Sequence, residues 1–126
     1  LHRVKHVNDK YGHLAVEKVL MQIGRRFSLA LRPSDVVCRY GGEEFCIVLP
    51  DTDGNGARVA LATLSDRLRE MIVEWGGESL TGFTFSAGIA VFPQNGQSLG
   101  ELISAADQAL YDAKGSGRDR AVVAPG

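Results

Sequence analysis

The stretch Arg39-Tyr40-Gly41-Gly42-Glu43-Glu44-Phe45 contains two adjacent glycines. An apolar run lies on each side of it, Val36-Val37-Cys38 before and Phe45 to Leu49 after. Two adjacent glycines between such runs are typical of a tight turn that joins antiparallel strands. The stretch therefore predicts a β-hairpin over residues 35–49, with Gly41 and Gly42 as a two-residue tip.

Three helices are predicted around this hairpin, because apolar residues recur there at helical spacing. The first covers residues 16–30 and stops before Pro33. The second carries its apolar face over residues 57–75 and is expected to end at Gly76-Gly77. The third covers residues 98–115, where Ser98 and Glu101 form a capping-box pattern.

Two further strands complete the predicted order of elements. Residues 83–91 alternate between large and small or polar side chains, which is the period of a strand. A short last strand is expected over residues 120–124. The fold class is therefore α/β, with helices packed on a mostly antiparallel central sheet. Because nothing at the start supplies a central strand, we expect the chain to begin just after one.

Length and composition limit the function. The chain has 126 residues, 44% of them hydrophobic and 23% charged, which fits one globular domain over residues 1–126. Fourteen basic residues against fifteen acidic ones give a net charge of −1, so a generally basic nucleic-acid-binding protein is excluded. No apolar run reaches the length of a membrane span, and we expect no membrane contact by this domain.

The two cysteines are expected to be reduced and unpaired. In a hairpin with a two-residue tip, Cys38 would pair with Phe45 and Val37 with Cys46. Neighbouring strand residues point to opposite faces, so Cys38 and Cys46 are predicted on opposite sides of the sheet, beyond the reach of a disulfide.

The predicted hairpin tip is the strongest candidate for chemistry. Glu43 and Glu44 cannot both serve one site from a regular strand, but one of them could bind a metal from a distorted turn. Gly41 and Gly42 would let a polyphosphate approach the backbone closely. The alternative is that the glycines form only a turn and the glutamates are solvated.

Two other groups could bind a nucleotide. Lys5, Asn8 and His13 lie close together near the start of the chain, and an asparagine amide suits the edge of a base. Lys114 and Arg118 flank a Gly-Ser-Gly turn and could hold phosphates. The alternatives are a polar helix end with a surface histidine for the first group and neutralisation of a helix dipole for the second.

Together these groups resemble the GGDEF family of diguanylate cyclases, in its GGEEF form. The resemblance covers essentially the whole chain: residues 5–13 match the family's F-K-x-x-N-D-x-x-G-H segment, and residues 109–118 match its A-L-Y-x-A-K-x-x-G-R segment. It implies a palm-like nucleotidyl cyclase fold and the condensation of two GTP molecules into cyclic di-GMP, with release of pyrophosphate.

The resemblance also implies roles for individual residues. Glu43 would bind metal and act as the general base, Glu44 would be a second carboxylate at the metals, and Lys5 would stabilise phosphoryl charge. The metal would be Mg²⁺, as two ions, or Mn²⁺. The backbone carbonyl of Leu1 is a further expected metal ligand. The substrate-binding set would be Asn8, His13 and Glu17 at the guanine, Gly41 and Gly42 at the tip, and Lys114 and Arg118 at the β- and γ-phosphates.

The start of the chain departs from the family pattern. The family's first metal-binding aspartate would lie immediately before Leu1, so this GGDEF domain is expected to be truncated at its N-terminus. The next family aspartate aligns with His2, and the usual Gly-Asp of the following helix is Val16-Glu17. Three functions remain open from the residues: an active cyclase, a degenerate GGDEF domain that senses GTP or cyclic di-GMP, or a pure interaction module, against which the retained phosphate-side residues argue.

Regulation and partners follow from the same resemblance. Arg32-Pro33-Ser34-Asp35 matches the family's R-x-x-D inhibitory site for cyclic di-GMP, although a helix end and a strand start would explain these residues without a ligand. The expected partners are GTP, cyclic di-GMP, a second copy in a catalytic homodimer, and an N-terminal sensory or receiver domain in the parent protein. The expected location is cytoplasmic, in a parent protein that is either cytosolic or membrane-anchored.

Overall fold

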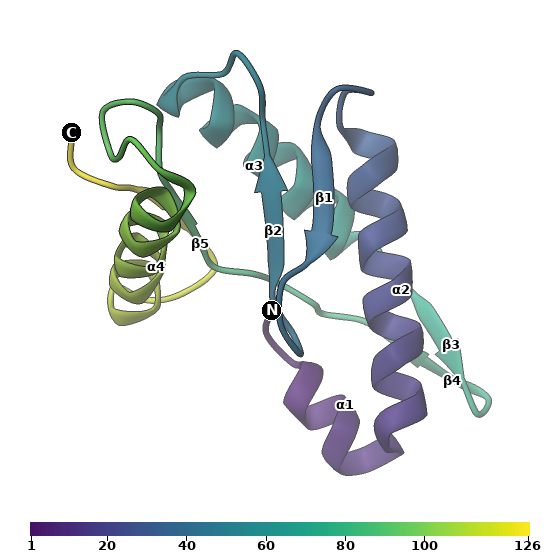
Figure 1. Cartoon of the computed structure of the whole chain (residues 1–126). Helices are drawn as coiled ribbons and strands as arrows, with labels where there is room; N and C mark the ends of the chain where they lie inside the picture. The colour runs from purple at the N-terminus through teal and green to yellow at the C-terminus, as the bar shows by residue number, and fades with distance from the viewer. The chain divides into compact units, whose positions relative to one another are not determined.

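The computed structural model describes residues 1–126 and has a mixed α/β composition (Figure 1). Its elements in chain order are α1 Val4–Tyr11, α2 His13–Ala30, β1 Val36–Arg39, β2 Phe45–Val48, α3 Gly54–Arg69, β3 Val73–Trp75, β4 Glu78–Leu80, β5 Ala87–Ile89, α4 Leu99–Gly115 and β6 Ala121–Val123. The strands form three two-stranded sheets, of which β1–β2 and β3–β4 are antiparallel and β5–β6 is parallel. The predicted α/β class is confirmed, and two of the three pairings are antiparallel.

The chain divides into two compact units. The first unit comprises residues 1–50 and 62–84, and the second comprises residues 51–61 and 85–126. Helix α3 contributes to both, because the division falls within it after Leu61.

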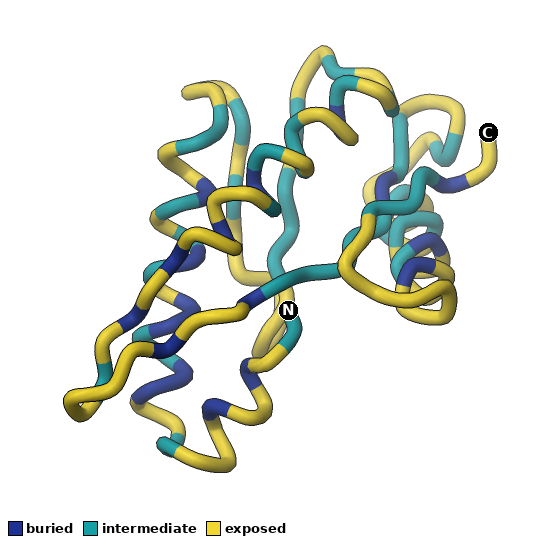
Figure 2. The backbone as a smooth tube through the Cα atoms, turned by 180° about the vertical axis from the view of Figure 1, so that it is seen from behind, coloured by how far each residue is buried: buried dark blue, intermediate teal, exposed yellow.

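The core of the first unit is built on helix α2. Its buried residues recur every three or four positions, as predicted, although the helix begins at His13 rather than at Val16. Figure 2 shows buried segments alternating with exposed ones along α1 and α2. The fully buried side chains that complete this core come from α1, α3, the link between α3 and β3, β3 itself and the segment after β4, and they are Val4, Val7, Leu64, Leu68, Met71, Val73 and Phe83.

Helix α1 was not predicted as an element. Its eight residues bury only Val4 and Val7, and this short apolar spacing gives too weak a signal for a helix. Gly12, with φ +90° and ψ 179°, ends α1 and precedes α2. The two valines that α1 buries secure it within the first unit.

The second predicted helix is wrong beyond Arg69. Helix α3 ends there, and β3 and β4 form a hairpin with Trp75 opposite Glu78. Met71 and Val73 are buried while Ile72 and Glu74 are exposed, which is an alternation of period two that a helical reading of the apolar residues overlooked. Gly76 and Gly77 have φ of +57° and +81° and form the hairpin turn rather than a helix end.

The register predicted for the β1–β2 hairpin is also wrong, by one residue. Cys38 lies opposite Cys46 and Arg39 opposite Phe45, and the Tyr40 N–H donates to the Glu44 carbonyl at 2.9 Å. The loop therefore contains Gly41, Gly42 and Glu43 rather than two glycines. Cys38 and Cys46 consequently share one face of the hairpin instead of lying on opposite faces. Both are free thiols, as predicted.

The second unit packs α4 against the β5–β6 pair. The Ser98 hydroxyl caps α4 by accepting from the Glu101 N–H at 3.2 Å, which confirms the predicted capping box. A Cβ on Gly88 would lie 1.9 Å from the Ala106 carbonyl oxygen, so only glycine permits this close approach of β5 to α4. The strand predicted over residues 83–91 is shorter: β5 covers Ala87–Ile89, and Thr84 forms an isolated bridge with His2.

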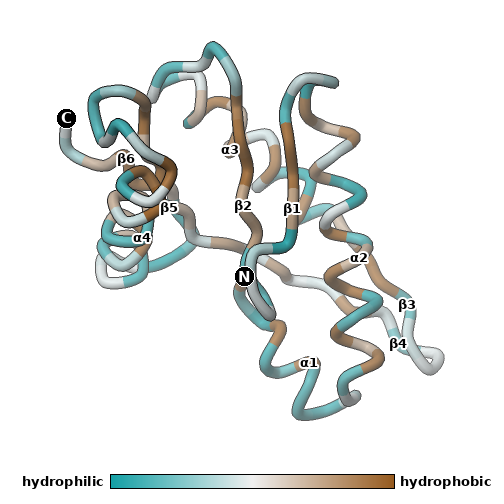
Figure 3. The backbone as a smooth tube through the Cα atoms, viewed as in Figure 1, coloured by the Kyte–Doolittle hydropathy of each residue, from teal (hydrophilic) through white to brown (hydrophobic).

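None of the helices has both the length and the apolar character needed to cross a lipid bilayer. In Figure 3 the strands β1 and β2 are hydrophobic along most of their length, although both are flanked by polar loops.

The two Gly-Gly pairs should respond differently to alanine. Gly77→Ala should lower the free energy of unfolding by about 1–2 kcal/mol, because an L-residue is strained at φ +81°. Gly42→Ala should change it by less than about 1 kcal/mol, because Gly42 lacks a left-handed φ and a Cβ there meets nothing within 4 Å. Urea unfolding followed by Trp75 fluorescence measures both, and equal losses would contradict the difference between the two turns.

Candidate functional site

The tip of the β1–β2 hairpin is held to helix α2 by Arg39. Its guanidinium donates to both carboxylate oxygens of Glu17, at 2.9 and 3.3 Å, and to the carbonyl oxygen of Gly42 at 2.8 Å. A planar guanidinium can serve two acceptors in this way because its donors form a fixed fork. Arg39 therefore fastens the bent loop of the hairpin and the helix to one another.

The same face of the hairpin rests on α2 through an aromatic contact. The rings of Phe45 and Phe27 meet edge to face, with centroids 5.7 Å apart. A Cβ on Gly24 would lie 3.4 Å from the Phe45 ring, so Gly24 lets the ring lie close to the helix backbone. Since Arg39 and Phe45 are paired across the strands, a charged and an apolar contact together select the observed register.

Glu43 and Glu44 lie at the exposed tip. Glu43 is the last residue of the three-residue loop, and Glu44 directly precedes β2 and accepts the hydrogen bond from the Tyr40 N–H, so Glu43 sits on the turn itself. No group of three or more histidine, cysteine, aspartate or glutamate side chains is assembled to hold a metal ion. The two exposed carboxylates still suit Mg²⁺, which proteins often bind through one or two carboxylates together with substrate phosphates.

Gly41 and Gly42 are surrounded by open space. A Cβ on Gly41 would meet only the Cβ of Glu44, at 4.0 Å, and a Cβ on Gly42 would meet nothing. Neither glycine has the left-handed φ that would make glycine necessary for the turn. The conformation of the loop therefore does not explain the two glycines, and a ligand that needs close access to the backbone would.

The predicted nucleotide residues of the first unit lie on two consecutive helices. Lys5 and Asn8 are three residues apart on α1, and both are exposed. His13 is the first residue of α2, and its Nε2 lies 3.8 Å from a carboxylate oxygen of Glu17. Leu1 directly precedes His2, which pairs with Thr84 in the isolated bridge. The structure thus brings His13 and Glu17 together and joins Glu17, through Arg39, to the hairpin tip.

Lys114 and Arg118 lie at the end of α4, in the second unit, and both are exposed. The chain turns after the helix through Gly117, at φ +121°, and the Arg118 N–H donates to the Ala113 carbonyl at 3.0 Å. This turn follows the pattern of a helix end in which a backbone N–H satisfies a free carbonyl. The structure thus confirms that the two cations flank a helix terminus.

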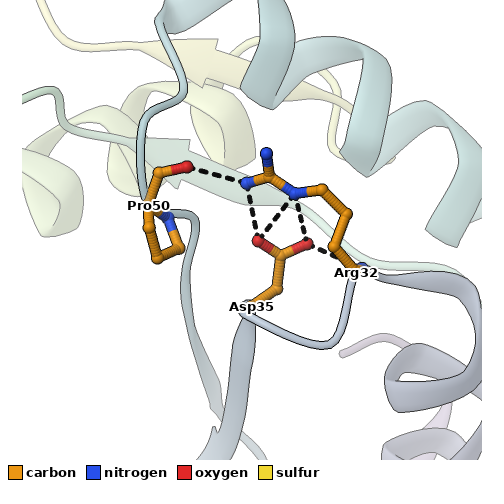
Figure 4. Close-up of polar contacts among 3 residues, drawn as sticks. All are labelled: Arg32, Asp35 and Pro50. Atoms are coloured by element: carbon orange, nitrogen blue, oxygen red, sulfur yellow. Dashed lines mark hydrogen bonds and ion pairs between the residues drawn. The ribbon is translucent and has the colours of Figure 1, made fainter.

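The R-x-x-D residues form a closed pair (Figure 4). The Arg32 side chain donates through Nη2 to Asp35 Oδ1 at 2.7 Å and through Nε to both carboxylate oxygens, at 3.1 and 3.2 Å. Nη2 also donates to the Pro50 carbonyl at 2.8 Å, and the Arg32 backbone N–H donates to Asp35 Oδ2 at 2.8 Å. The Asp35 side chain is only 2% exposed. These bonds join the end of α2, the start of β1 and the end of β2.

Two carboxylates that accept hydrogen bonds from an arginine have a lowered pKa. The hydrogen bonds from Arg39 lower the pKa of Glu17, and those from Arg32 lower the pKa of Asp35. Each carboxylate therefore stabilises the fold above its unfolded-state pKa, and that stabilisation is lost as the pH falls through the lower folded-state pKa.

Arg39 is the site residue to which sequence reasoning assigned no role. The signal was present, because Arg39 lies within the hairpin motif and Glu17 is an acidic residue on the neighbouring predicted helix. Only the three-residue loop places Arg39 on the face of the hairpin that meets α2.

Comparison with known proteins gives consistent matches. The family model for the diguanylate cyclase GGDEF domain matches residues 1–120. The chain is 43% identical to the diguanylate cyclase DgcP of Pseudomonas aeruginosa over 121 residues, which is 95% of this chain and 18% of DgcP. Its fold is similar to the crystal structure of the GGDEF domain of YfiN, also called TpbB, from the same organism. That match has a TM-score of 0.90 and 30% identity, and covers 98% of this chain and 77% of that one.

A second solved structure is the GGDEF domain of DgcB from Caulobacter crescentus in complex with c-di-GMP. It matches with a TM-score of 0.86 and 26% identity over 97% of this chain and 72% of that one. These structural neighbours confirm the predicted palm-like cyclase fold. The chain spans less than a fifth of the length of DgcP.

The contact between Arg39 and Glu17 has a measurable consequence for titration. Arg39→Ala should raise the pKa of the Glu17 carboxyl toward its ordinary value, because the hydrogen bonds that favour the carboxylate are lost. Carboxyl carbon chemical shifts measured by NMR across the acidic range report this pKa. Arg25→Ala removes an exposed arginine of the same helix and should leave the titration of Glu17 unchanged. An unchanged pKa in Arg39→Ala would contradict the contact.

Proposed function

Because the chain belongs to the GGDEF family of diguanylate cyclase domains, we propose that it condenses two GTP molecules into cyclic di-GMP and releases two pyrophosphates. The observation that carries this proposal is the hairpin tip. Gly41 to Phe45 has the GGEEF form of the family motif, and its two glycines face open space that the turn itself does not require.

Glu43 is the proposed general base. It lies on the exposed loop, where its carboxylate can approach the 3′-hydroxyl of a bound GTP and accept its proton. Glu43, Glu44 and the Leu1 carbonyl are the proposed ligands of Mg²⁺, with Mn²⁺ as an alternative. When bound, two such ions would supply charge stabilisation for the phosphates and for the attacking and leaving oxygens.

Binding and orientation of GTP are assigned to the remaining residues. Asn8 would recognise the guanine edge with its amide, which can both donate and accept, and His13 would line the same pocket. Lys5, three residues from Asn8 on α1, would stabilise charge on the phosphoryl oxygens. In the second unit, Lys114 and Arg118 would hold the β- and γ-phosphates. In the first unit, Gly41 and Gly42 would let a polyphosphate approach the backbone of the hairpin loop.

Glu17 enters this scheme differently from the residue expected in the family. Its carboxylate is bound by both terminal nitrogens of Arg39, so contact with guanine requires it to share or give up these bonds. Glu17 is one methylene longer than aspartate, which gives it the reach to contact both. We therefore assign Glu17 a weakened contribution to guanine binding alongside its bond to Arg39.

The domain organisation and assembly are part of the proposal. The family match spans both compact units, which supports treating residues 1–126 as one GGDEF domain. Formation of cyclic di-GMP joins two GTP molecules, and a homodimer with one GTP per subunit would bring them together. A sensory or receiver domain on the N-terminal side would control the encounter, since the matched relatives are several times longer than this chain.

A second candidate function rests on Glu17 and His2. Glu17 is held by Arg39, and His2 stands where the family pattern has an aspartate and pairs with Thr84. These two departures favour a degenerate GGDEF domain that binds GTP or cyclic di-GMP without turnover. GTP turnover in the presence of Mg²⁺, followed by chromatography for cyclic di-GMP, distinguishes the two functions.

Product inhibition is proposed at Arg32 and Asp35. An arginine fork suits a phosphate or the Hoogsteen edge of guanine, and a carboxylate accepts from the ring N–H groups. In the structure these groups bind each other and Pro50, so cyclic di-GMP would have to compete with existing bonds. Bound there as an intercalated dimer, the nucleotide would hold two domains apart from productive encounter.

Replacement of the general base tests the proposed activity. Glu43→Gln in the whole natural protein should reduce GTP turnover by roughly 100-fold or more, because it keeps the shape of the side chain and removes the proton acceptor. Glu70→Gln changes an exposed glutamate at the end of the α3 region and should leave turnover unchanged. Turnover near the wild-type rate in Glu43→Gln would remove Glu43 from its role.

The inhibitory site is tested by calorimetric titration of cyclic di-GMP. Arg32→Ala should weaken binding roughly tenfold or more, because charge-assisted hydrogen bonds contribute about 1.5–3 kcal/mol each. Arg32 also braces β1 and β2, so Arg32→Lys provides a milder variant, and circular dichroism checks that both remain folded. Equal affinity in wild type and in both folded variants would exclude this site, whatever the rate of GTP turnover.

A further inference from the structure

We propose that Cys38 and Cys46 form a dithiol site that a low-molecular-weight disulfide oxidises to a disulfide across the β1–β2 hairpin. The two residues lie directly opposite each other in the register of the hairpin, and Cys38 Sγ is 3.6 Å from the Cys46 carbonyl oxygen. Both thiols are free in the ligand-free chain. The chemical class of the reactant is a small aliphatic disulfide, of which oxidised glutathione is the probe used below.

The hairpin geometry matches what a disulfide needs. Cys38 and Cys46 lie two residues along each strand from the hydrogen bond between Tyr40 and Glu44, so they form a hydrogen-bonded pair, and the Cα atoms of such a pair are about 5.5 Å apart. Disulfides span Cα separations of about 4.4–6.8 Å. Paired residues also project to the same face of the hairpin. The two Cβ atoms therefore point the same way, and the two sulfurs can approach each other while the strands keep their orientation.

The pair lies on the accessible face of the hairpin. Arg39 and Phe45, on the other face, contact α2. The face with the cysteines also carries Val36 and Val48, which are 52% and 48% exposed. Cys38 is itself exposed, while Cys46 is half-buried. A small disulfide can therefore reach Cys38 first.

The two steps balance as ordinary thiol–disulfide exchange. The Cys38 thiolate attacks one sulfur of oxidised glutathione, and one glutathione thiolate leaves and takes up a proton. Cys46, after losing its proton, then attacks Cys38 Sγ and displaces the second glutathione as a thiolate, which is also protonated. The protein loses two electrons and two protons, and the small disulfide gains them.

The bond would act one residue pair away from the contacts that hold the tip. Arg39 and Phe45, which tie the hairpin to α2, immediately follow and precede the two cysteines along the strands. Closing a bond between the strands at this point would draw them together behind the loop of Gly41, Gly42 and Glu43. We therefore expect the backbone conformation of that loop to depend on the oxidation state of the two cysteines.

The experiment treats the 126-residue chain with excess oxidised glutathione, alkylates the remaining thiols and measures the mass of the intact chain. Wild type should lose two hydrogens without retaining glutathione. Trypsin cleavage after Arg39 separates the two cysteines, so the peptides should stay linked until dithiothreitol is added. Cys46→Ser should instead keep a stable glutathione adduct on Cys38. The amide signals of Gly41 and Gly42 should shift on oxidation of wild type.

A matched control exchanges residues 46 and 48, as Cys46→Val with Val48→Cys. This variant has the same composition, but its two cysteines are diagonal neighbours. Their Cα atoms are about 7–8 Å apart, which is too far for a disulfide. It should stop at the glutathione adducts, and its Gly41 and Gly42 signals should show no closure of the hairpin. A persistent mixed disulfide in wild type, a disulfide between two chains, or equal closure in the exchanged variant would each overturn the proposal.

Discussion

The site of the first unit depends on the contacts that Arg39 makes. One guanidinium binds the carboxylate of Glu17 on α2 and the carbonyl of Gly42 in the hairpin loop, so it joins helix, strand and loop at one point. Its cross-strand partner Phe45 packs on Phe27 of the same helix. A hairpin with one residue fewer in its loop would turn Arg39 away from the face that Phe45 presents to α2. The loop length, and with it the position of Glu43, follows from these two contacts.

The two Gly-Gly pairs show that the same dipeptide can occur for different physical reasons. Gly76 and Gly77 both adopt left-handed backbone angles that other residues avoid, so they are explained by the β3–β4 turn alone. Gly41 and Gly42 do not, and the space around them is open. In the first pair the missing side chain serves the backbone conformation, and in the second it leaves room for something to approach. Only the second pair therefore belongs to the proposed substrate site.

Two arginines at the proposed sites of the first unit, Arg39 and Arg32, are occupied within the chain. Arg39 binds Glu17, and Arg32 binds Asp35 and the Pro50 carbonyl, where it also braces the base of the hairpin. A nucleotide that uses Glu17 or the Arg32–Asp35 pair must therefore exchange its own hydrogen bonds for these internal ones. The net affinity at such a site is smaller than the sum of the new contacts, because the lost bonds are subtracted from it.

Local patterns in the sequence were enough to predict the family, the helices α2 and α4 with their stop and cap, the existence of the β1–β2 hairpin, and the residues that belong to the motifs. Each of these depends on local spacing or on side chains close together in the chain. The tertiary structure alone decided the hairpin register, the placement of both cysteines on one face, and the role of Arg39. It also placed the residues predicted as the end of the second helix in the β3–β4 hairpin. These features depend on partners distant in sequence: Glu17 and Phe27 choose the face of the hairpin, and burial of Met71 and Val73 outweighs the helical spacing of their neighbours.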